Sequence, residues 1–264
     1  MRKIDLNCDM GESFGVYKLG IDEEVIKLIT SANIACGFHA GDPNVMDRTV
    51  AMAKEYGVGI GVHMGFPDLL GFGRREMDIS SEDLINYCIY QMGALQAFCD
   101  KHGVEIQHIK PHGSLGNMCV VNRRVANAVV DSIRLVLPDT KLFVIPSGEI
   151  HKAAVENGLS VVLEVFADRA YTKEGNLVSR KIPGAVIKDS AEAAEHVMRM
   201  VVENKIKTID GELIDIEAQS VCVHGDTPGA LEVIRQVRAK LEHAGVEIGP
   251  VGRWHKTELK LHDR

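Results

Sequence analysis

The sequence predicts an α/β fold, a single-domain seven-stranded parallel β/α barrel, from three observations. Short apolar segments alternate with segments of helical periodicity, which is typical of parallel α/β proteins. Four of the eleven histidines follow directly on four different predicted strands (His39, His63, His112 and His224). A barrel brings the carboxyl ends of all its strands to one rim, whereas an open doubly wound sheet brings together only those near its switch point. Closure into a barrel is therefore favoured.

The expected strands are short, and polar or glycine-containing turns separate them. The first alternates polar and apolar residues, and the second is small and apolar, as suits a strand buried on both faces. Glycines in the third permit close approach of the backbone. The strands are predicted over residues 3–7, 33–38, 57–63, 105–110, 141–145, 160–166 and 220–223.

The expected helices are recognised by apolar residues at helical spacing and by their end signals. Asp42 is placed to cap the second helix, and Pro43 occupies its first turn, where the missing N–H has no effect. The segment 64–77 is predicted to be a long irregular loop, and such loops are usually functional or disordered. Helices are predicted over residues 22–30, 44–56, 81–101, 122–137, 147–156, 190–204 and 229–244, with a small hairpin around Asp210-Gly211.

Composition and charge exclude several classes of protein. The 264 residues, 45% of them hydrophobic, can build one large core, so we expect one domain over residues 1–264. The net charge of −7 gives no basic surface for nucleic acid, and no apolar run approaches the ~20 residues of a membrane span. The first ten residues lack an apolar signal-peptide core, so a cytoplasmic location is expected. The six cysteines show no C-x-x-C spacing and are expected to be reduced and buried.

Two nucleotide-binding motifs are absent from the sequence. Neither G-x-G-x-x-G nor G-x-x-x-x-G-K-[ST] occurs. This absence disfavours a dinucleotide-binding or P-loop protein.

Six sequence blocks together resemble one known family. They are residues 5–15 (DLNCDMGESFG), 31–43 (SANIACGFHAGDP), 71–75 (GFGRR), 110–113 (KPHG), 164–169 (EVFADR) and 224–228 (HGDTP). In this order, and over nearly the whole chain, they are similar to the lactam-utilisation family, the A subunit of bacterial 5-oxoprolinase. The chain departs from the family's usual pattern at Met64-Gly65 and at Gly116, where the family has a proline after the histidine and a tyrosine.

The resemblance implies both a fold and an activity. The fold is a seven-stranded β/α barrel of the deacetylase-like, distorted TIM type. The activity is the ATP-dependent hydrolysis of 5-oxo-L-proline (pyroglutamate) to L-glutamate, with ADP and phosphate as the other products. The implied cofactors are ATP and its Mg²⁺, and the implied partners are subunits B and C of 5-oxoprolinase.

Polar residues at the strand exits are the candidates for this chemistry. Opening an unstrained lactam requires an activated carbonyl, a positioned water, a general base and donors for the oxyanion. Asp9 and His63 are predicted as the base or water-orienting groups, and His39, His112 and Asp226 complete the catalytic pocket. Asp168-Arg169 is interpreted as an internal ion pair that orders a loop. Substrate or phosphate is expected to contact Lys110, Arg74, Arg75, His224 and Glu12.

Two other functions stay open at this stage. An aspartate with two or three histidines at a barrel rim is also a possible Zn²⁺ or Mn²⁺ ligand set, as in a metal-dependent amide or acetyl hydrolase. No H-x-x-x-H or H-E-x-x-H spacing supports such a site, so a tightly bound transition metal is not expected and no metal ligands are assigned. The chain could also be a non-catalytic lactam-binding subunit that presents the substrate to a partner enzyme.

Overall fold

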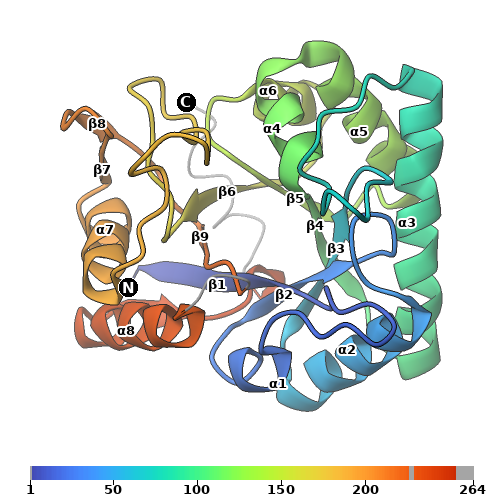
Figure 1. Ribbon diagram of the computed structural model, residues 1–264, viewed down its shortest axis with the longest axis horizontal. Helices are drawn as coiled ribbons and strands as arrows, with labels where there is room; N and C mark the ends of the chain where they lie inside the picture. Colours follow the sequence, from blue (N-terminus) through green and yellow to red (C-terminus); the bar gives the residue numbers. More distant parts are fainter. Residues whose placement is uncertain (1, 226–228, 254–264) are drawn as a thin grey trace.

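The strands form a closed parallel ring. A computed structural model describes residues 2–225 and 229–253. Neighbouring strands follow the order β1-β2-β3-β4-β5-β6-β9, and β9 pairs back onto β1 (Figure 1). The predicted seven-stranded parallel barrel is therefore confirmed. Its strands are β1 (Lys3–Met10), β2 (Ser31–Ala35), β3 (Gly59–Met64), β4 (Ile106–Pro111), β5 (Lys141–Val144), β6 (Val161–Phe166) and β9 (Ser220–Cys222).

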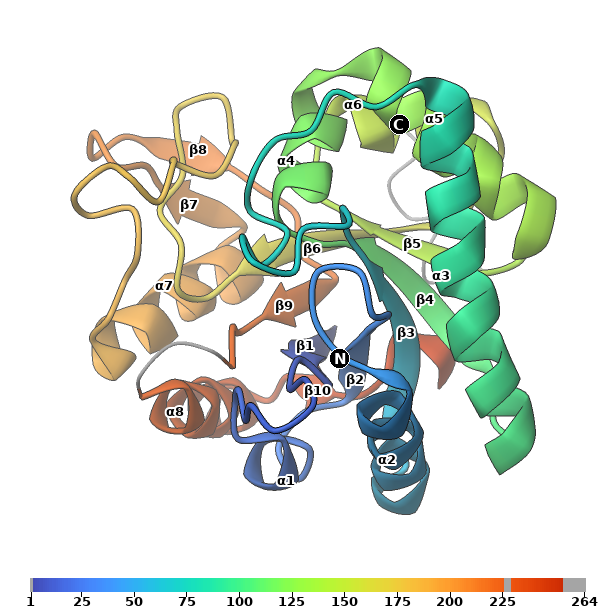
Figure 2. The ribbon, with the colours of Figure 1, turned by 45° about the vertical axis from the view of Figure 1, so that its right-hand side comes forward.

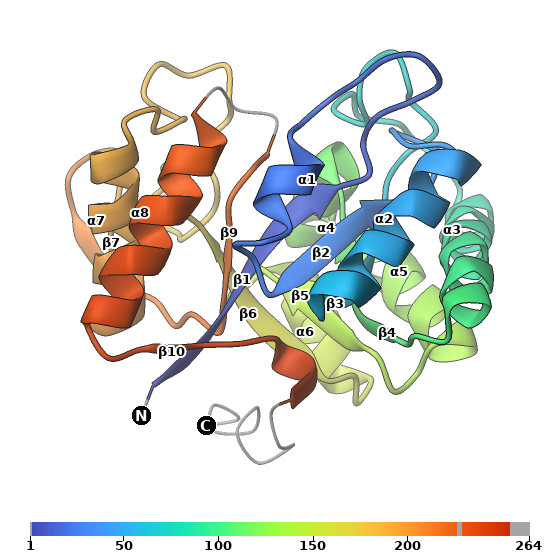
Figure 3. The ribbon, with the colours of Figure 1, turned by 90° about the horizontal axis from the view of Figure 1, so that it is seen from below.

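Helices cover the outside of the ring. In Figure 3, α7 and α8 lie side by side on the side of the barrel opposite to α3. Asp42 caps α2 as predicted, because its Oδ1 accepts from the N–H groups of Asn44 (2.8 Å) and Val45 (2.9 Å). None of the described helices is long and apolar enough to cross a membrane. The helices are α1 (Asp22–Val25), α2 (Pro43–Tyr56), α3 (Ser81–His102), α4 (Gly113–Val121), α5 (Arg123–Val136), α6 (Glu149–Glu156), α7 (Ser190–Val202) and α8 (Ala230–His243), followed by a 3₁₀ turn, η1 (Val251–Arg253).

Two helices differ from the sequence prediction. The helix predicted over residues 22–30 is a single turn, because Thr30 already donates its N–H to the Leu6 carbonyl of β1 (2.8 Å). A helix, α4, follows β4 directly where none was predicted. Glycine disfavours a helix interior, yet Gly116 is required by close packing: a Cβ there would lie 2.8 Å from the Pro111 carbonyl oxygen.

Two short strand pairings lie outside the ring. The predicted hairpin around Asp210-Gly211 is present as β7 (Lys205–Lys207) and β8 (Leu213–Asp215), and Figure 2 shows it beside α7. β10 (Glu247–Ile248), which the sequence analysis did not predict, pairs with the first residues of β1. Neither pairing contributes to the closure of the ring.

The barrel interior is polar along β1. Ile4, Leu6, Cys8 and Met10 belong to the apolar core between the strands and the helices. The alternate residues Asp5, Asn7 and Asp9 therefore point into the ring, because successive side chains of a strand face opposite sides. Asn7 Nδ2 donates to Glu164 Oε1 of β6 (2.9 Å) across the interior, since β1 and β6 are not neighbours in the ring. The polar interior continues upward into the rim that holds the candidate residues.

Gly61 of β3 makes room for a histidine inside the barrel. A Cβ at this position would lie 2.0 Å from His108 Nε2. His108 is fully buried, stacks on Phe143 (ring centroids 4.2 Å apart) and contacts Asn33 Oδ1 through Nε2 (2.6 Å). Burial holds the pKa of His108 well below its ordinary value, so the ring is neutral near pH 7. This histidine belongs to the interior below the rim.

The buried His196 of α7 makes stability depend on pH. Burial lowers its pKa to about 4, whereas an unfolded histidine titrates near pH ~6.5. Because the unfolded state binds the proton more readily, the stabilising contribution is fully present above pH ~6.5 and is lost as the pH falls towards 4, by up to about 3 kcal/mol. We expect the stability difference between the wild type and His196→Leu to shift by this amount between pH 7 and 4. Urea unfolding followed by circular dichroism measures it, and a difference that is constant with pH would contradict the assignment.

Candidate active site

A cavity opens at the carboxyl ends of the strands. Its volume is about 900 Å³, and its walls include residues of β1, β3, β4, β5 and β6, of α4, and of the segments after β3, β6 and β9. The candidate residues Asp9, His63, Lys110, His112 and His224 all line it. The expectation that strand exits converge on one pocket is thus met for these five side chains.

Asp9 is held between two basic side chains. Its Oδ2 lies 3.2 Å from His63 Nε2, and its Oδ1 lies 3.0 Å from Lys110 Nζ. Burial acts to raise the pKa of Asp9, but the charges of His63 and Lys110 outweigh it and hold this pKa well below its usual range. Asp9 is therefore a carboxylate at neutral pH, beside a histidine that can exchange a proton with it.

Lys110 is buried in the middle of the barrel mouth. Its Nζ contacts Glu164 Oε1 (3.1 Å) in addition to Asp9, and it also donates to Cys222 Sγ (3.0 Å). Burial acts to lower the pKa of Lys110, yet the carboxylates of Asp9 and Glu164 raise it well above its ordinary value. The lysine is a fixed cation at the floor of the cavity, where it can meet an anionic group of a ligand.

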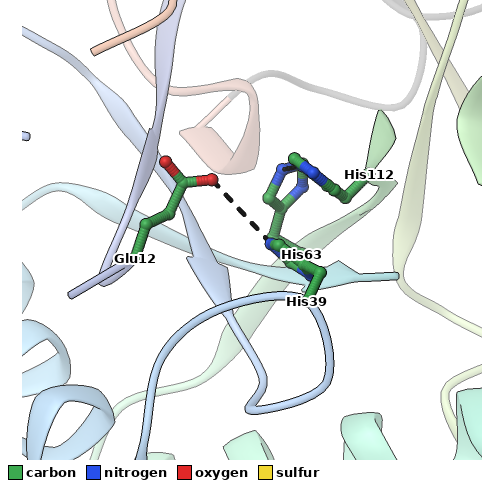
Figure 4. A group of neighbouring side chains, drawn as sticks. All are labelled: Glu12, His39, His63 and His112. Carbon is green, nitrogen blue, oxygen red and sulfur yellow. Dashed lines mark hydrogen bonds and ion pairs between the residues drawn. The ribbon is translucent and has the colours of Figure 1, made fainter. Parts of the chain in front are cut away.

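Three histidine rings lie against each other beside Asp9. His112 Nδ1 contacts His63 Nε2 (2.9 Å), and His39 stacks face to face on His112 with ring centroids 3.8 Å apart. Glu12 faces the group, with Oε1 3.8 Å from His39 Nε2 (Figure 4). His39 and Glu12 are buried beneath the loops and are not part of the cavity wall. Burial holds the pKa of His39 and of His112 well below the ordinary value, so both rings are neutral.

Glycines allow this close packing of rings. A Cβ at Gly73 would lie 2.7 Å from His39 Cβ and 2.8 Å from His112 Cδ2. A Cβ at Gly65 would lie 2.7 Å from His39 Nδ1. Gly65 and Gly73 of the irregular loop after β3 are therefore required because any larger residue would overlap the histidine rings.

His224 is paired with Asp168 in the wall of the cavity. Its Nδ1 lies 2.8 Å from Asp168 Oδ1 and 2.9 Å from Oδ2. Burial acts to raise the pKa of Asp168, but His224 outweighs it and this pKa is lowered. Arg169 donates to the carbonyl oxygens of Val178 (2.6 Å) and Ala185 (3.4 Å). This arginine orders the loop after β6 through backbone carbonyls, and Asp168 holds the histidine.

The two loop arginines differ in their surroundings. Arg74 lines the cavity and places its guanidinium over the Phe72 ring, 4.8 Å from the centroid. Arg75 also reaches the rim, but its guanidinium pairs with the buried Asp68, and its Nε donates to Oδ1 (2.9 Å). Both arginines therefore bring a guanidinium to the rim of the cavity. Asp226, the remaining candidate, lies outside the described residues.

Four interior residues around Lys110 and Asp9 were not singled out from the sequence. Asn33 Nδ2 donates to Asp9 Oδ1 (2.8 Å), and Asn7, Glu164 and Cys222 contact Lys110 or one another. They lie within strands rather than at the exits that the sequence analysis considered. A signal for Asn7 and Asn33 is polar residues two apart within a strand, as at positions 5, 7 and 9 or 31 and 33. Glu164 gives no such signal, because the residues two positions away on either side are apolar.

Comparisons with known proteins agree with this fold. The family model described as the LamB/YcsF family matches residues 4–256. The chain belongs to the LamB/YcsF family. Among other members, the Pyrococcus horikoshii protein named as the A subunit of 5-oxoprolinase is 51% identical over 249 residues, covering 94% of this chain and 98% of that protein. The protein of the same name from Clostridium beijerinckii is 50% identical over 251 residues, with 95% and 98% covered.

A solved structure shows the same barrel. The crystal structure of the lactam utilization protein from Thermus thermophilus superimposes with a TM-score of 0.89 at 44% identity, covering 94% of this chain and 99% of that protein. The family resemblance seen in the six sequence blocks is thereby confirmed.

Proposed function

We propose that this chain is a subunit of an ATP-dependent 5-oxoprolinase and contributes the site where the lactam of 5-oxo-L-proline is hydrolysed to L-glutamate. The observation that carries the proposal is the Asp9–His63 pair at the floor of the cavity, beside the Lys110 cation. Its support from relatives is that proteins named as the A subunit of 5-oxoprolinase are about half identical to this chain over nearly their whole length.

The geometry suits attack of water on an activated lactam. Phosphorylation of the amide oxygen by ATP would make the ring carbon electrophilic, and water would then add to that carbon while its proton passes to the Asp9–His63 pair. Breaking the ring C–N bond requires a proton on the leaving nitrogen, which the same pair can return, and it leaves a carboxyl phosphate. A second water would then release phosphate from this carboxyl group and give L-glutamate. Lys110 and Arg74 are cations that can meet the substrate carboxylate, phosphate or the developing oxyanion.

Partner subunits are part of the proposal. The sequence lacks a P-loop, and phosphoryl transfer generally needs a phosphate-binding loop, a lysine and a Mg²⁺-holding acid in one arrangement. ATP and Mg²⁺ are therefore assigned to the assembly with subunits B and C rather than to this chain alone.

We expect the isolated chain to release neither glutamate nor ADP from 5-oxoproline and Mg-ATP at a physiological rate. Adding subunits B and C is expected to start coupled release of glutamate and ADP, measured by coupled enzymatic assays. Coupled release by the isolated chain would refute the division of labour, and no release in either mixture would count against 5-oxoproline as the substrate.

His63→Ala in the same assembly separates catalysis from presentation of the substrate. We expect it to lower turnover by at least ~10²-fold, because the general base pair is broken. His243→Ala on the exposed end of α8 is the matched control and should leave turnover unchanged. Unchanged turnover with weakened 5-oxoproline binding in His63→Ala would instead assign a non-catalytic, lactam-binding role to this chain.

A further inference from the structure

Four buried side chains from four successive strand exits meet next to Asp9, and His63 is one of them. Glu12, His39, His63 and His112 each direct one ligand atom inward, and these four atoms all lie within 4.8 Å of one another (Figure 4). They follow or end β1, β2, β3 and β4, which is why no short spacing in the sequence announces the group.

The hydrogen bonds of His63 and His112 leave two nitrogen lone pairs face to face. His63 Nδ1 lies 3.0 Å from the Lys110 carbonyl oxygen, and His112 Nε2 lies 2.8 Å from the Phe72 carbonyl oxygen. A carbonyl oxygen can only accept, so each of these outer nitrogens carries the proton. In neutral rings the inner nitrogens, His63 Nε2 and His112 Nδ1, are then both acceptors, and they are only 2.9 Å apart. This contact requires a cation between or beside them, which is either a proton on His63 shared with His112 or a metal ion.

The same arrangement is characteristic of metal-binding histidines. Such a histidine usually donates its outer N–H to a backbone carbonyl or a carboxylate, which fixes the ring and aims the inner lone pair at the ion. Both His63 and His112 do so. The inner nitrogens of His63 and His112 are 2.9 Å apart, which is close to the roughly 3.3 Å between two ligands of a tetrahedral zinc ion.

His39 argues for a metal ion rather than a single shared proton. It is fully buried, and within the described part of the chain neither of its ring nitrogens has a hydrogen-bond partner. A proton shared by His63 and His112 would leave both His39 nitrogens buried without a hydrogen-bond partner. An ion at the centre of the group would be bound by His39 as well, once the ring turns out of its stacked position on His112.

We propose that Glu12, His39, His63 and His112 bind one divalent transition-metal ion of the Zn²⁺ class. Imidazole nitrogens with one carboxylate oxygen are a ligand set that suits this class. When bound, such an ion would supply Lewis-acid activation at the edge of the cavity. The site itself stands on the side-chain geometry, whereas its use in lactam opening rests on the proposed function. An ion bound to His63 Nε2 would leave Asp9 as the proton acceptor of the pair.

Titration of chelator-treated, dialysed protein tests the site without any assay of activity. Isothermal titration calorimetry with Zn²⁺ should give one ion per chain, and Co²⁺ should give visible absorption bands of a protein-bound ion. His39→Ala and His112→Ala should each weaken the affinity by at least ~10²-fold, the upper end of what the loss of a ligand's outer hydrogen-bond partner causes. Glu12→Gln provides a second readout if a histidine variant fails to fold.

A matched variant distinguishes this group from its neighbour. Asp9, Cys222 and His224 form a second group with ligand atoms within 4.8 Å of one another, and His224 is not among the proposed ligands, so His224→Ala should leave Zn²⁺ affinity unchanged. Binding lost in His224→Ala but kept in His39→Ala would overturn the assignment. So would the absence of saturable Zn²⁺ or Co²⁺ binding by the folded wild type, which would make the His63–His112 cation a proton. Metal binding without 5-oxoproline turnover in the assembled complex would refute the proposed function and leave the site standing.

Discussion

Asp9→Asn is expected to lower the turnover of the proposed 5-oxoprolinase assembly by at least ~10²-fold. The amide has the shape of the carboxylate but can neither take up a proton nor balance His63 and Lys110, which lie 3.2 and 3.0 Å from its oxygens. The measurement is kcat for glutamate release by the chain reconstituted with subunits B and C. Circular dichroism of the purified variant checks that the barrel is intact.

Asp139→Asn is the matched control for this substitution. Asp139 is an exposed residue in the turn between α5 and β5, remote from the cavity wall. Its amide variant should keep wild-type turnover. If Asp9→Asn and His63→Ala both turned over like the wild type, the assignment of the site to the mouth of β1 and β3 would be refuted.

Lys110→Met is expected to destabilise the protein by about 3–5 kcal/mol. Removing this cation leaves the carboxylates of Asp9 and Glu164 buried without their shared partner, and an uncompensated buried charge is strongly destabilising. For a chain of this size the midpoint of thermal unfolding should fall by roughly 6–20 °C. Differential scanning calorimetry and urea unfolding at pH 7 measure the loss.

Two further variants test the electrostatic cause. Lys110→Met/Glu164→Gln should recover part of the lost stability, because one of the two unpaired carboxylates becomes neutral. Lys205→Met breaks an exposed ion pair with Asp215 in the β7–β8 hairpin and should change stability by less than ~1 kcal/mol. A Lys110→Met variant as stable as wild type would show that the buried charges are not coupled as described.

The histidines at strand exits could be located from the sequence because the argument needed only the order of elements. Parallel strands in a closed ring all end at one rim, so His63, His112 and His224 had to approach Asp9 once each was recognised as following a strand. The same reasoning could not say which of them face the cavity and which lie beneath a loop. His39 is of the second kind, because the glycines after β3 let the chain fold over it.

The sequence by itself determined the parallel barrel and the family, because periodicity and the six motif blocks are local properties of the chain. Only the tertiary structure decided the pairings across the ring. Glu164 and Cys222 reach Lys110 from β6 and β9, which are distant in the chain, and a polar residue inside a strand gives no sign of its partner. The convergence of the ligand atoms of Glu12, His39, His63 and His112 was likewise decided only by the tertiary structure. Their spacing is set by the curvature of a closed sheet, which places the exits of β1 to β4 side by side.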